Sequence, residues 1–287
     1  MQLEPGPLMT STARISAQHP GVVRLGQAGW FAKGVVYLLA GYLALALALR
    51  EWGSSITPGA TGGQEASPTG AIKTVAGSTG GGVLLWLLAI GMLLYAAWRI
   101  VSGLLLGGRD ASALAHRVGY IVSAIVYITF AVSAIGLARD SSVRPDGNRD
   151  VTDISASVMA HRAGRIAIGL AGVVIMIVGL YRISKGLRSD VMDELDHKFS
   201  ARRARWTQHL GAVGEVGRGL GIGLVGFFLL RSALSYDAAE ATGLDGALRR
   251  TLVAPGGVAV VAAVAVGLAA YGLFCLVTFT HRRLETP

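Results

Sequence analysis

The chain has 287 residues, of which 52% are hydrophobic and only 15% are charged, and its mean hydropathy is +0.54. Soluble domains carry about 25% charged residues, so this composition excludes an ordinary soluble protein and indicates an integral membrane protein. The net charge of +9 would suit nucleic acid, but the arginines are divided among loops and membrane edges. We therefore expect contact with a membrane surface and no nucleic-acid partner.

Six apolar stretches are each long enough to cross a membrane as a helix. A hydrocarbon core of about 30 Å needs roughly 20 helical residues. Each stretch is a continuous apolar run without the alternation of a barrel strand. The chain is therefore predicted to be an all-α integral membrane protein with transmembrane helices near 29–50, 83–106, 117–138, 165–187, 212–235 and 256–280. Residues 1–28 are predicted to form a flexible tail, and the Gly-, Ser- and Thr-rich connection 51–82 a flexible loop.

The same pair of apolar segments recurs three times along the chain. The first segments align at 29–37, 119–127 and 214–222, and the third copy is the weakest. The second segments align at 98–103 and 181–186, and Gly91-x-x-x-Tyr95 aligns with Gly267-x-x-x-Tyr271. Each copy is predicted to be a membrane hairpin, because the two segments of each copy are both membrane spans. The expected fold is three tandem helical hairpins in a pseudo-threefold arrangement, at 29–106, 117–187 and 212–284.

The segment 190–210, between the second and third hairpins, has the pattern of a cytoplasmic amphipathic helix. Val191, Leu195 and Phe199 recur every four residues, with acidic residues around them and basic residues at the end of the segment. The basic end is predicted to anchor the segment on anionic lipid, and docking of a cytoplasmic partner is the alternative. This predicted interfacial anchor consists of Arg202, Arg203, Arg205 and Trp206.

Four basic residues fall inside predicted spans, where a charge costs a few kcal/mol and is a candidate functional group. They are Lys33, Arg99, Arg182 and Arg218. The repeats align them in two sets. Lys33 and Arg218 share a first-helix position with Ser123, and the other two share a second-helix position with Cys275.

Two interpretations of these four cations stay open. In the first, they form a pseudo-threefold cluster that opens toward the cytoplasm and binds an anion, a lipid phosphate in preference to a small anionic solute. In the second, they reach the headgroups by snorkelling or bond to polar groups of other helices. The polar groups considered are Ser102, Ser123, Ser184 and Tyr side chains.

Depth in the membrane separates the four cations. Lys33 lies only about 6 Å inside its span, at about 1.5 Å per residue, and can snorkel to the headgroups. Arg182 and Arg218 each lie about 9 Å inside their spans and can still snorkel. Arg99 lies about 15 Å from Arg109, near mid-membrane, and needs a partner or a water-filled cavity. Glu215, three residues before Arg218, is placed to pair with it within one helix.

Motifs of enzymes and cofactor sites do not occur in the sequence. There is no His-x-x-x-His, G-x-S-x-G, Walker-type or haem-attachment motif, so we expect no catalytic, cofactor-binding or metal site. One group of side chains resembles a set of metal ligands and consists of Asp190, Asp193, Asp196 and His197. Neighbouring cations are available to pair with this group, so it is not expected to bind a metal. Aromatic residues near span ends, such as Trp30, Trp52 and Tyr120, are interpreted as interfacial belt residues.

Loop charges predict the orientation of the chain. Lys and Arg are in slight excess in the loops on the side of the N-terminus, and the number of spans is even. Both termini are therefore expected in the cytoplasm.

The repeated motifs resemble a known family. They are Arg24-Leu25-Gly26, Gly34-Val35-Val36-Tyr37, Arg117-Val118-Gly119 and Gly267-Leu268-Ala269-Ala270-Tyr271-Gly272. Over 24–284 the chain resembles the actinobacterial membrane family called domain of unknown function 1206, whose members carry three tandem two-helix units. In the third unit, Ile222 replaces the Tyr and Cys275 replaces the Arg. The resemblance implies a multi-pass protein of the bacterial inner membrane and supplies no activity.

Two functions are compatible with the sequence. The first is a non-enzymatic structural or accessory membrane protein that binds anionic lipid, a membrane-protein partner or further copies of itself. The alternative is a transporter or channel for a small, anionic solute. Two helices per unit leave successive repeats in the same orientation, unlike the inverted repeats of many carriers, which counts against the alternative.

Overall fold

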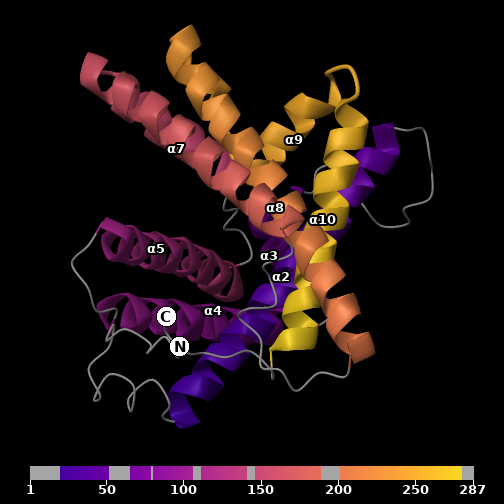
Figure 1. The fold of residues 1–287 in the computed structure, drawn as a ribbon. Coiled ribbons are helices and arrows are strands. Elements are labelled where there is room, and N and C mark those ends of the chain that lie inside the picture. The colour runs from indigo at the N-terminus through magenta and orange to yellow at the C-terminus, as the bar shows by residue number, and fades with distance from the viewer. Residues whose placement is uncertain are drawn as a thin grey trace, which may run out of the picture.

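The computed structural model describes residues 20–51, 65–78, 80–105, 111–140, 146–188 and 201–279. Its long helices are α2 (Pro20–Glu51), α4 (Gly81–Leu105), α5 (Ala111–Arg139), α7 (Arg162–Leu187), α8 (Ala201–Ser235) and α10 (Gly257–Thr278) (Figure 1). Each contains a stretch long and apolar enough to cross a membrane. The all-α fold with six membrane-spanning helices is therefore confirmed. The predicted flexible tail over 1–28 is wrong for 20–28, which form the first turns of α2, and 1–19 lie outside the described residues.

Three shorter helices lie in the connections inside the repeats, one per repeat. They are α3 (Pro68–Ala76), α6 (Gly147–Met159) and α9 (Leu244–Leu252), the last preceded by the 3-10 helix η2 (Ala238–Glu240). The prediction of a flexible loop over 51–82 is wrong for its described part. There, the Ser67 hydroxyl caps the backbone N–H of Gly70, Pro68 fixes the first helical turn, and Ile72 is buried. The glycine-rich composition concealed a capped and packed helix.

The most extensive packing joins consecutive repeats. The second helix of each repeat packs against the first helix of the next, as α4 against α5, α7 against α8, and α10 against α2 (Figure 1). The last of these contacts joins the third repeat to the first and closes a ring of three helix pairs. The pseudo-threefold arrangement thus rests on contacts between repeats more than on contacts within a hairpin.

Glycines allow these helix pairs to approach closely. A Cβ on Gly41 of α2 would lie 2.5 Å from the backbone nitrogen of Ala269 in α10. A Cβ on Gly172 of α7 would lie 2.6 Å from the backbone nitrogen of Leu230 in α8. Small residues are typical where membrane helices touch, because dispersion between close backbones replaces the hydrophobic effect.

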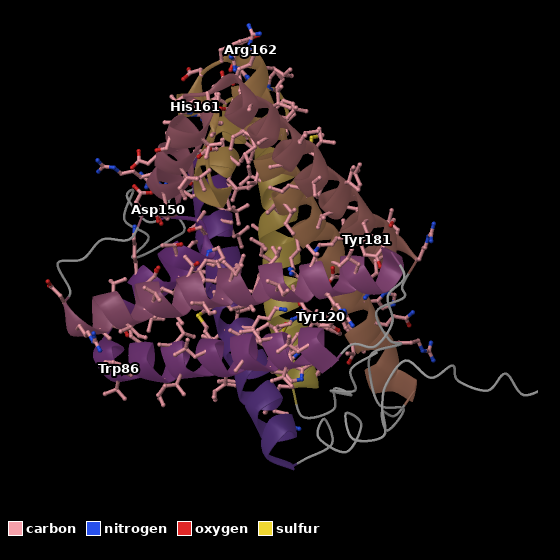
Figure 2. The ribbon with its side chains drawn as sticks, turned by 90° about the vertical axis from the view of Figure 1, so that its left-hand side faces the viewer. Trp86, Tyr120, Asp150, His161, Arg162 and Tyr181 are labelled. Carbon is pink, nitrogen blue, oxygen red and sulfur yellow. The ribbon has the colours of Figure 1, made fainter. Side chains whose placement is uncertain are left out.

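A glycine–tyrosine contact closes the first and third hairpins but not the second. A Cβ on Gly29 would lie 2.8 Å from the Cα of Tyr95, and one on Gly214 would lie 2.7 Å from the Cα of Tyr271. In repeat two, a Cβ on the equivalent Gly119 would meet nothing within 4 Å. Accordingly, α5 and α7 do not pack along their length, and Figure 2 shows α7 running away from α5. The second hairpin is open.

The three short helices contact one another in a cycle. Thr69 of α3 faces Gly147 of α6, since a Cβ on that glycine would lie 3.2 Å from the Thr69 Oγ1. The Asn148 side-chain oxygen of α6 accepts a hydrogen bond from the backbone N–H of Gly246 in α9 at 3.1 Å. Asp245 of α9 accepts a hydrogen bond at 2.6 Å from the backbone N–H of Ala66, the residue that precedes the N-cap of α3. In each case the second residue of one helix contacts the start of another, so the threefold repeat extends into the connections.

Candidate functional site

Lys33 of α2 lies in an aromatic cage formed by four side chains. Its Nζ is 4.3 Å from the ring centroid of Trp30, 5.1 Å from that of Tyr95, 5.2 Å from that of Tyr271 and 5.6 Å from that of Tyr127. The ammonium also donates a hydrogen bond to the Tyr95 hydroxyl at 3.3 Å, and Lys33 is only 3% exposed. The expectation that Lys33 snorkels to the headgroups is wrong, because π faces and a hydroxyl hold the ammonium inside the protein.

Trp30 belongs to this cage and is not an interfacial belt residue, which corrects the interpretation from sequence. It is 2% exposed. Its indole N–H donates a hydrogen bond at 3.2 Å to Thr278, near the end of α10. The position of Trp30 near a span end suggested the lipid interface, but close packing of α2, α4 and α10 covers it.

Arg218 of α8 occupies a second aromatic site beside the cage. Its guanidinium carbon is 3.9 Å from the ring centroid of Tyr271 and 5.0 Å from that of Tyr37. Its Nη1 donates to Glu215 at 3.1 Å, which confirms the predicted pair within one helix. The other carboxylate oxygen of Glu215 accepts from Arg182 of α7 at 2.9 Å. Glu215 thus bridges two arginines and joins α7 to α8.

Arg99 of α4 finds the polar partner that its depth requires. Its Nε donates a hydrogen bond to the Tyr95 hydroxyl at 3.1 Å, so this oxygen accepts from both Lys33 and Arg99. Its guanidinium carbon lies 4.9 Å from the ring centroid of Tyr120 in α5. The expected hydrogen bonds to serines are not formed: Ser102 has no hydrogen-bond partner in the described part of the chain, and the Ser184 hydroxyl donates to a carbonyl of its own helix.

We call Lys33, Arg99, Arg182 and Arg218, with Glu215, the basic cluster. Shared partners connect its members: the Tyr95 hydroxyl accepts from two of the cations, Glu215 pairs with the other two, and Tyr271 faces both Lys33 and Arg218. Among the described residues, Glu215 is the one carboxylate paired with these four cations. The Nε atoms of Arg182 and Arg218 are buried without a hydrogen-bond partner in the same part of the chain. The cluster therefore combines an excess of positive charge with unused donors.

The two aligned sets differ in exposure. The first-helix cations, Lys33 and Arg218, are 3% and 7% exposed, whereas the side chain of Arg182 in α7 is 31% exposed. Ser123, the first-helix equivalent in the open repeat, is partly exposed. The cluster is accordingly most accessible at repeat two.

Aromatic residues complete this site, and the sequence interpretation considered Tyr side chains only in general, as hydrogen-bond partners of the cations. Tyr37, Tyr95 and Tyr271 are the tyrosines of the repeated G-x-V-Y and G-x-x-x-Y motifs, and Tyr127 is the repeat-two equivalent of the first. Their recurrence with the embedded cations was the available signal. It was missed because a tyrosine in a span is equally compatible with the interface.

The predicted interfacial anchor lies partly within the described residues. Arg205 and Trp206 are exposed on the first turns of α8, and Trp206 is 68% exposed. Nothing interrupts the helix between these residues and the fifth span, so 201–210 continue directly into it. The side chains of Arg202 and Arg203 and the segment 189–200 lie outside the described residues, and with them the acidic group considered as metal ligands. Within the described ranges, no group of three or more His, Cys, Asp or Glu side chains is placed to hold a metal ion.

Comparison with known proteins agrees with this architecture. The family model described as Domain of Unknown Function (DUF1206) matches three times, at residues 28–105, 118–189 and 213–278, which are the three repeats. A similar protein is the Uncharacterized protein YxxB of Bacillus subtilis (strain 168), 28% identical over 269 residues that cover 92% of this chain and 93% of that protein. No solved structure matches. With three family matches that together span most of its length, this multi-pass membrane protein belongs to the DUF1206 family.

Proposed function

We propose that the protein is a non-enzymatic, accessory component of the bacterial inner membrane that binds the phosphate of an anionic lipid at the basic cluster. The observation that carries the proposal is the imbalance of charge. Four cations lie together inside a membrane protein, and among the described residues one carboxylate, that of Glu215, pairs with two of them. Both termini are proposed to lie in the cytoplasm, which places the cluster in the leaflet where anionic headgroups are abundant.

The aromatic rings stabilise these cations without neutralising them. A cation–π contact contributes about 0.5–2 kcal/mol, whereas a charge near the bilayer centre costs about 2.5–3.5 kcal/mol even on an insertion scale. An anion would lower that cost for several cations at once. Arginine suits phosphate best, because its planar donors match two phosphate oxygens. The Nε atoms of Arg182 and Arg218 are buried donors without a hydrogen-bond partner among the described residues.

Lipid is favoured over a soluble anion by the surroundings of the cluster. The partly exposed Arg182 lies on α7, whose neighbouring side chains Val178 and Leu180 are exposed and apolar. A ligand reaching Arg182 from this side meets hydrocarbon-facing surface, as a lipid does. The same location suits a contact with another membrane protein, which would be the route by which an accessory role is exercised.

A transporter or channel for a small anion is the alternative. Lys33 and Arg218 are buried, which suits a site that holds a bound anion better than a continuous pathway along which an anion moves. Parallel repeats also differ from the inverted repeats of many alternating-access carriers.

Lipid retention tests the proposal. The protein is purified in mild detergent, and bound phospholipid is measured by native mass spectrometry for wild type, Arg182→Gln and Arg149→Gln. Arg149 is a matched control, because it is an arginine of the α6 connection whose side chain is 79% exposed. We expect anionic lipid to be lost from Arg182→Gln alone. Equal retention by all three proteins would refute the proposal, and anion flux into proteoliposomes would favour the transporter.

A further inference from the structure

We infer that an anionic phospholipid enters the basic cluster sideways, between α5 and α7, with its phosphate at Arg182 and its acyl chains along the exposed faces of these two helices. This inference rests on the proposed function and specifies the route and the resting place of the lipid. The starting observation is that repeat two alone lacks the glycine–tyrosine contact that closes repeats one and three.

The residues of repeat two also differ at this contact. Alignment of the second helices places Val178 at the position of Tyr95 and Tyr271. Its side chain is smaller and 41% exposed, whereas the two tyrosines are 1% and 3% exposed. The equivalent glycine is present as Gly119, and a Cβ on it would meet no atom within 4 Å. Repeat two has thus kept the glycine, but its second helix does not approach this glycine as in the other two repeats.

The open side leads to the cluster along both helices. On α7, Val178 precedes Arg182 by four residues, so the two side chains share one face. On α5, Gly119, Ser123 and Tyr127 share a face in the same way, and Tyr127 is a wall of the Lys33 cage. Exposure falls along this second row from Gly119, which is exposed, through Ser123 to Tyr127, which is 6% exposed.

Charge and apolar surface match the two ends of a phospholipid. Arg182 has a 31% exposed side chain, so part of its guanidinium group is accessible from the membrane side. Beyond it, α7 presents Val174 at 58% and Leu170 at 62% exposure. A membrane-facing surface with a cationic side chain at one end and apolar side chains along its length selects an anionic lipid over inorganic phosphate, which has nothing to contact on the apolar part.

Two variants close the opening without touching the cationic residues. Val178→Tyr introduces the larger side chain of the other two repeats and fills the opening from the α7 side. Gly119→Phe fills the same space from the α5 side, and its new side chain meets no atom within 4 Å at Cβ. Gly82→Phe is the control, because Gly82 also has nothing within 4 Å and lies at the start of α4.

The experiment uses full-length protein in vesicles of phosphatidylglycerol and phosphatidylcholine that contain a trace of phosphatidylglycerol with a photoreactive acyl chain. Cross-linking to peptides of α5 and α7 is quantified by mass spectrometry. We expect wild type and Gly82→Phe to label equally, Gly119→Phe and Val178→Tyr to label several-fold less, and Arg182→Gln to label about tenfold less, as expected for one charged hydrogen bond. Excess inorganic phosphate is expected not to compete.

The outcomes separate the route from the proposed function. If Arg182→Gln loses bound lipid but both closing variants label as wild type does, the lateral route is wrong and the lipid site stands. If labelling of α5 and α7 is the same in all proteins, or equals that of phosphatidylcholine carrying the same photoreactive chain, both are wrong. Competition by inorganic phosphate would overturn the assignment of the ligand as a lipid. A variant that is not monodisperse in detergent is replaced by the other closing variant.

Discussion

The ammonium nitrogen of Lys33 lies 3.3 Å from the hydroxyl oxygen of Tyr95, although 62 residues separate the two in the chain. This hydrogen bond joins α2 to α4 at the point where the cage surrounds the ammonium. It also places a neutral oxygen where a carboxylate would be expected beside a buried lysine. The arrangement holds a positive charge without cancelling it.

Removing the Tyr95 hydroxyl should destabilise the protein. Tyr95→Phe keeps the ring but leaves Lys33 and Arg99 without the oxygen that accepts from both. We expect a loss of about 1–3 kcal/mol in the free energy of unfolding, since charged donors are left unsatisfied. Thermal unfolding in detergent measures it, and Tyr42→Phe is the control because Tyr42 is 46% exposed on the same helix as Lys33. Equal melting temperatures for the two variants would contradict a structural role of this oxygen.

Replacing Lys33 should separate stability from ligand binding. Lys33→Met keeps an unbranched side chain among four rings and removes the buried charge, and sulfur packs well against aromatic rings. Replacement of buried ions by apolar residues is often neutral or stabilising by about 1–4 kcal/mol. We therefore expect an unchanged or higher melting temperature together with weaker retention of anionic lipid. A lower melting temperature with unchanged lipid would show that the ammonium is a structural element.

Glu215→Gln should lower stability strongly and make it depend on lipid. The substitution leaves Arg182 and Arg218 without their carboxylate, and breaking a buried ion pair costs about 3–5 kcal/mol. Added phosphatidylglycerol is expected to raise the melting temperature of the variant more than that of wild type, because the uncompensated charge is larger. If the melting temperature of the variant rises less than that of wild type, the anion has no direct contact with the arginines that pair with Glu215. The comparison requires the same detergent and lipid ratio for both proteins.

Gly41→Ala should weaken the closure between the third and first repeats. The added methyl would lie 2.5 Å from the Ala269 backbone nitrogen, and such overpacking costs about 1–3 kcal/mol. Gly223→Ala is the matched control, because a Cβ there meets nothing within 4 Å and alanine favours a helix. Unfolding temperatures of the two variants are compared directly. A stable Gly41→Ala protein would mean that α2 and α10 can separate without cost.

Stability should fall as the pH rises through the range in which Glu65 titrates. Burial raises the pKa of Glu65 above its ordinary value of 4.5, although the ion pair with Lys73 at 2.9 Å opposes the shift. Between the ordinary and the raised pKa, the folded state holds more protons than the unfolded state, so the folded state loses stability with increasing pH. Glu65→Gln should remove this slope. Asp146 and Asp245 act on the same carboxyl and remain in the variant.

Asp146 contributes to the pH dependence of stability in the opposite direction from Glu65 and at lower pH. Burial acts to raise its pKa, but the backbone N–H groups of Arg149 and Asn148 donate to the carboxylate and hold the pKa below the ordinary value of 3.8. Its contribution is present above that value and is lost as the pH falls through the lowered pKa. The Glu65→Gln measurement is therefore made above pH 4, where this loss is small.

Hydropathy and repetition predicted most of the fold, because both are properties of continuous segments. The span limits agree with the structure within a few residues except at the fifth, whose apolar part begins at Arg205 instead of 212. The short helix α3 was missed, although Ser67 followed by Pro68 is a readable start signal. The openness of the second hairpin could not be predicted, because it depends on how α7 is placed relative to α5, which only the packing of the whole structure determines.

The sequence identified the four embedded cations but not the particular aromatic rings that surround Lys33. The alignment grouped the four cations correctly by helix position, and Glu215 was correctly paired with Arg218. The inward direction of Lys33 could not be predicted, because it depends on rings from α4, α5 and α10 that only the tertiary structure assembles. Trp30 was misplaced for the same reason, since its partner Thr278 is 248 residues away.

The cyclic contacts among α3, α6 and α9, together with the closure of α10 on α2, are those of a homotrimer whose three subunits have been joined end to end. Each unit presents one surface to the unit before it and a different surface to the unit after it, and the series closes at three, as in a heterologous ring with C3 symmetry. In a true trimer, the position of Lys33 would carry three identical cations facing one axis. Covalent fusion removes that constraint, so one copy can carry Ser123 and another can carry Arg218 with its own Glu215. An asymmetric site in a symmetric frame is what a single chain can build and a trimer of identical subunits cannot.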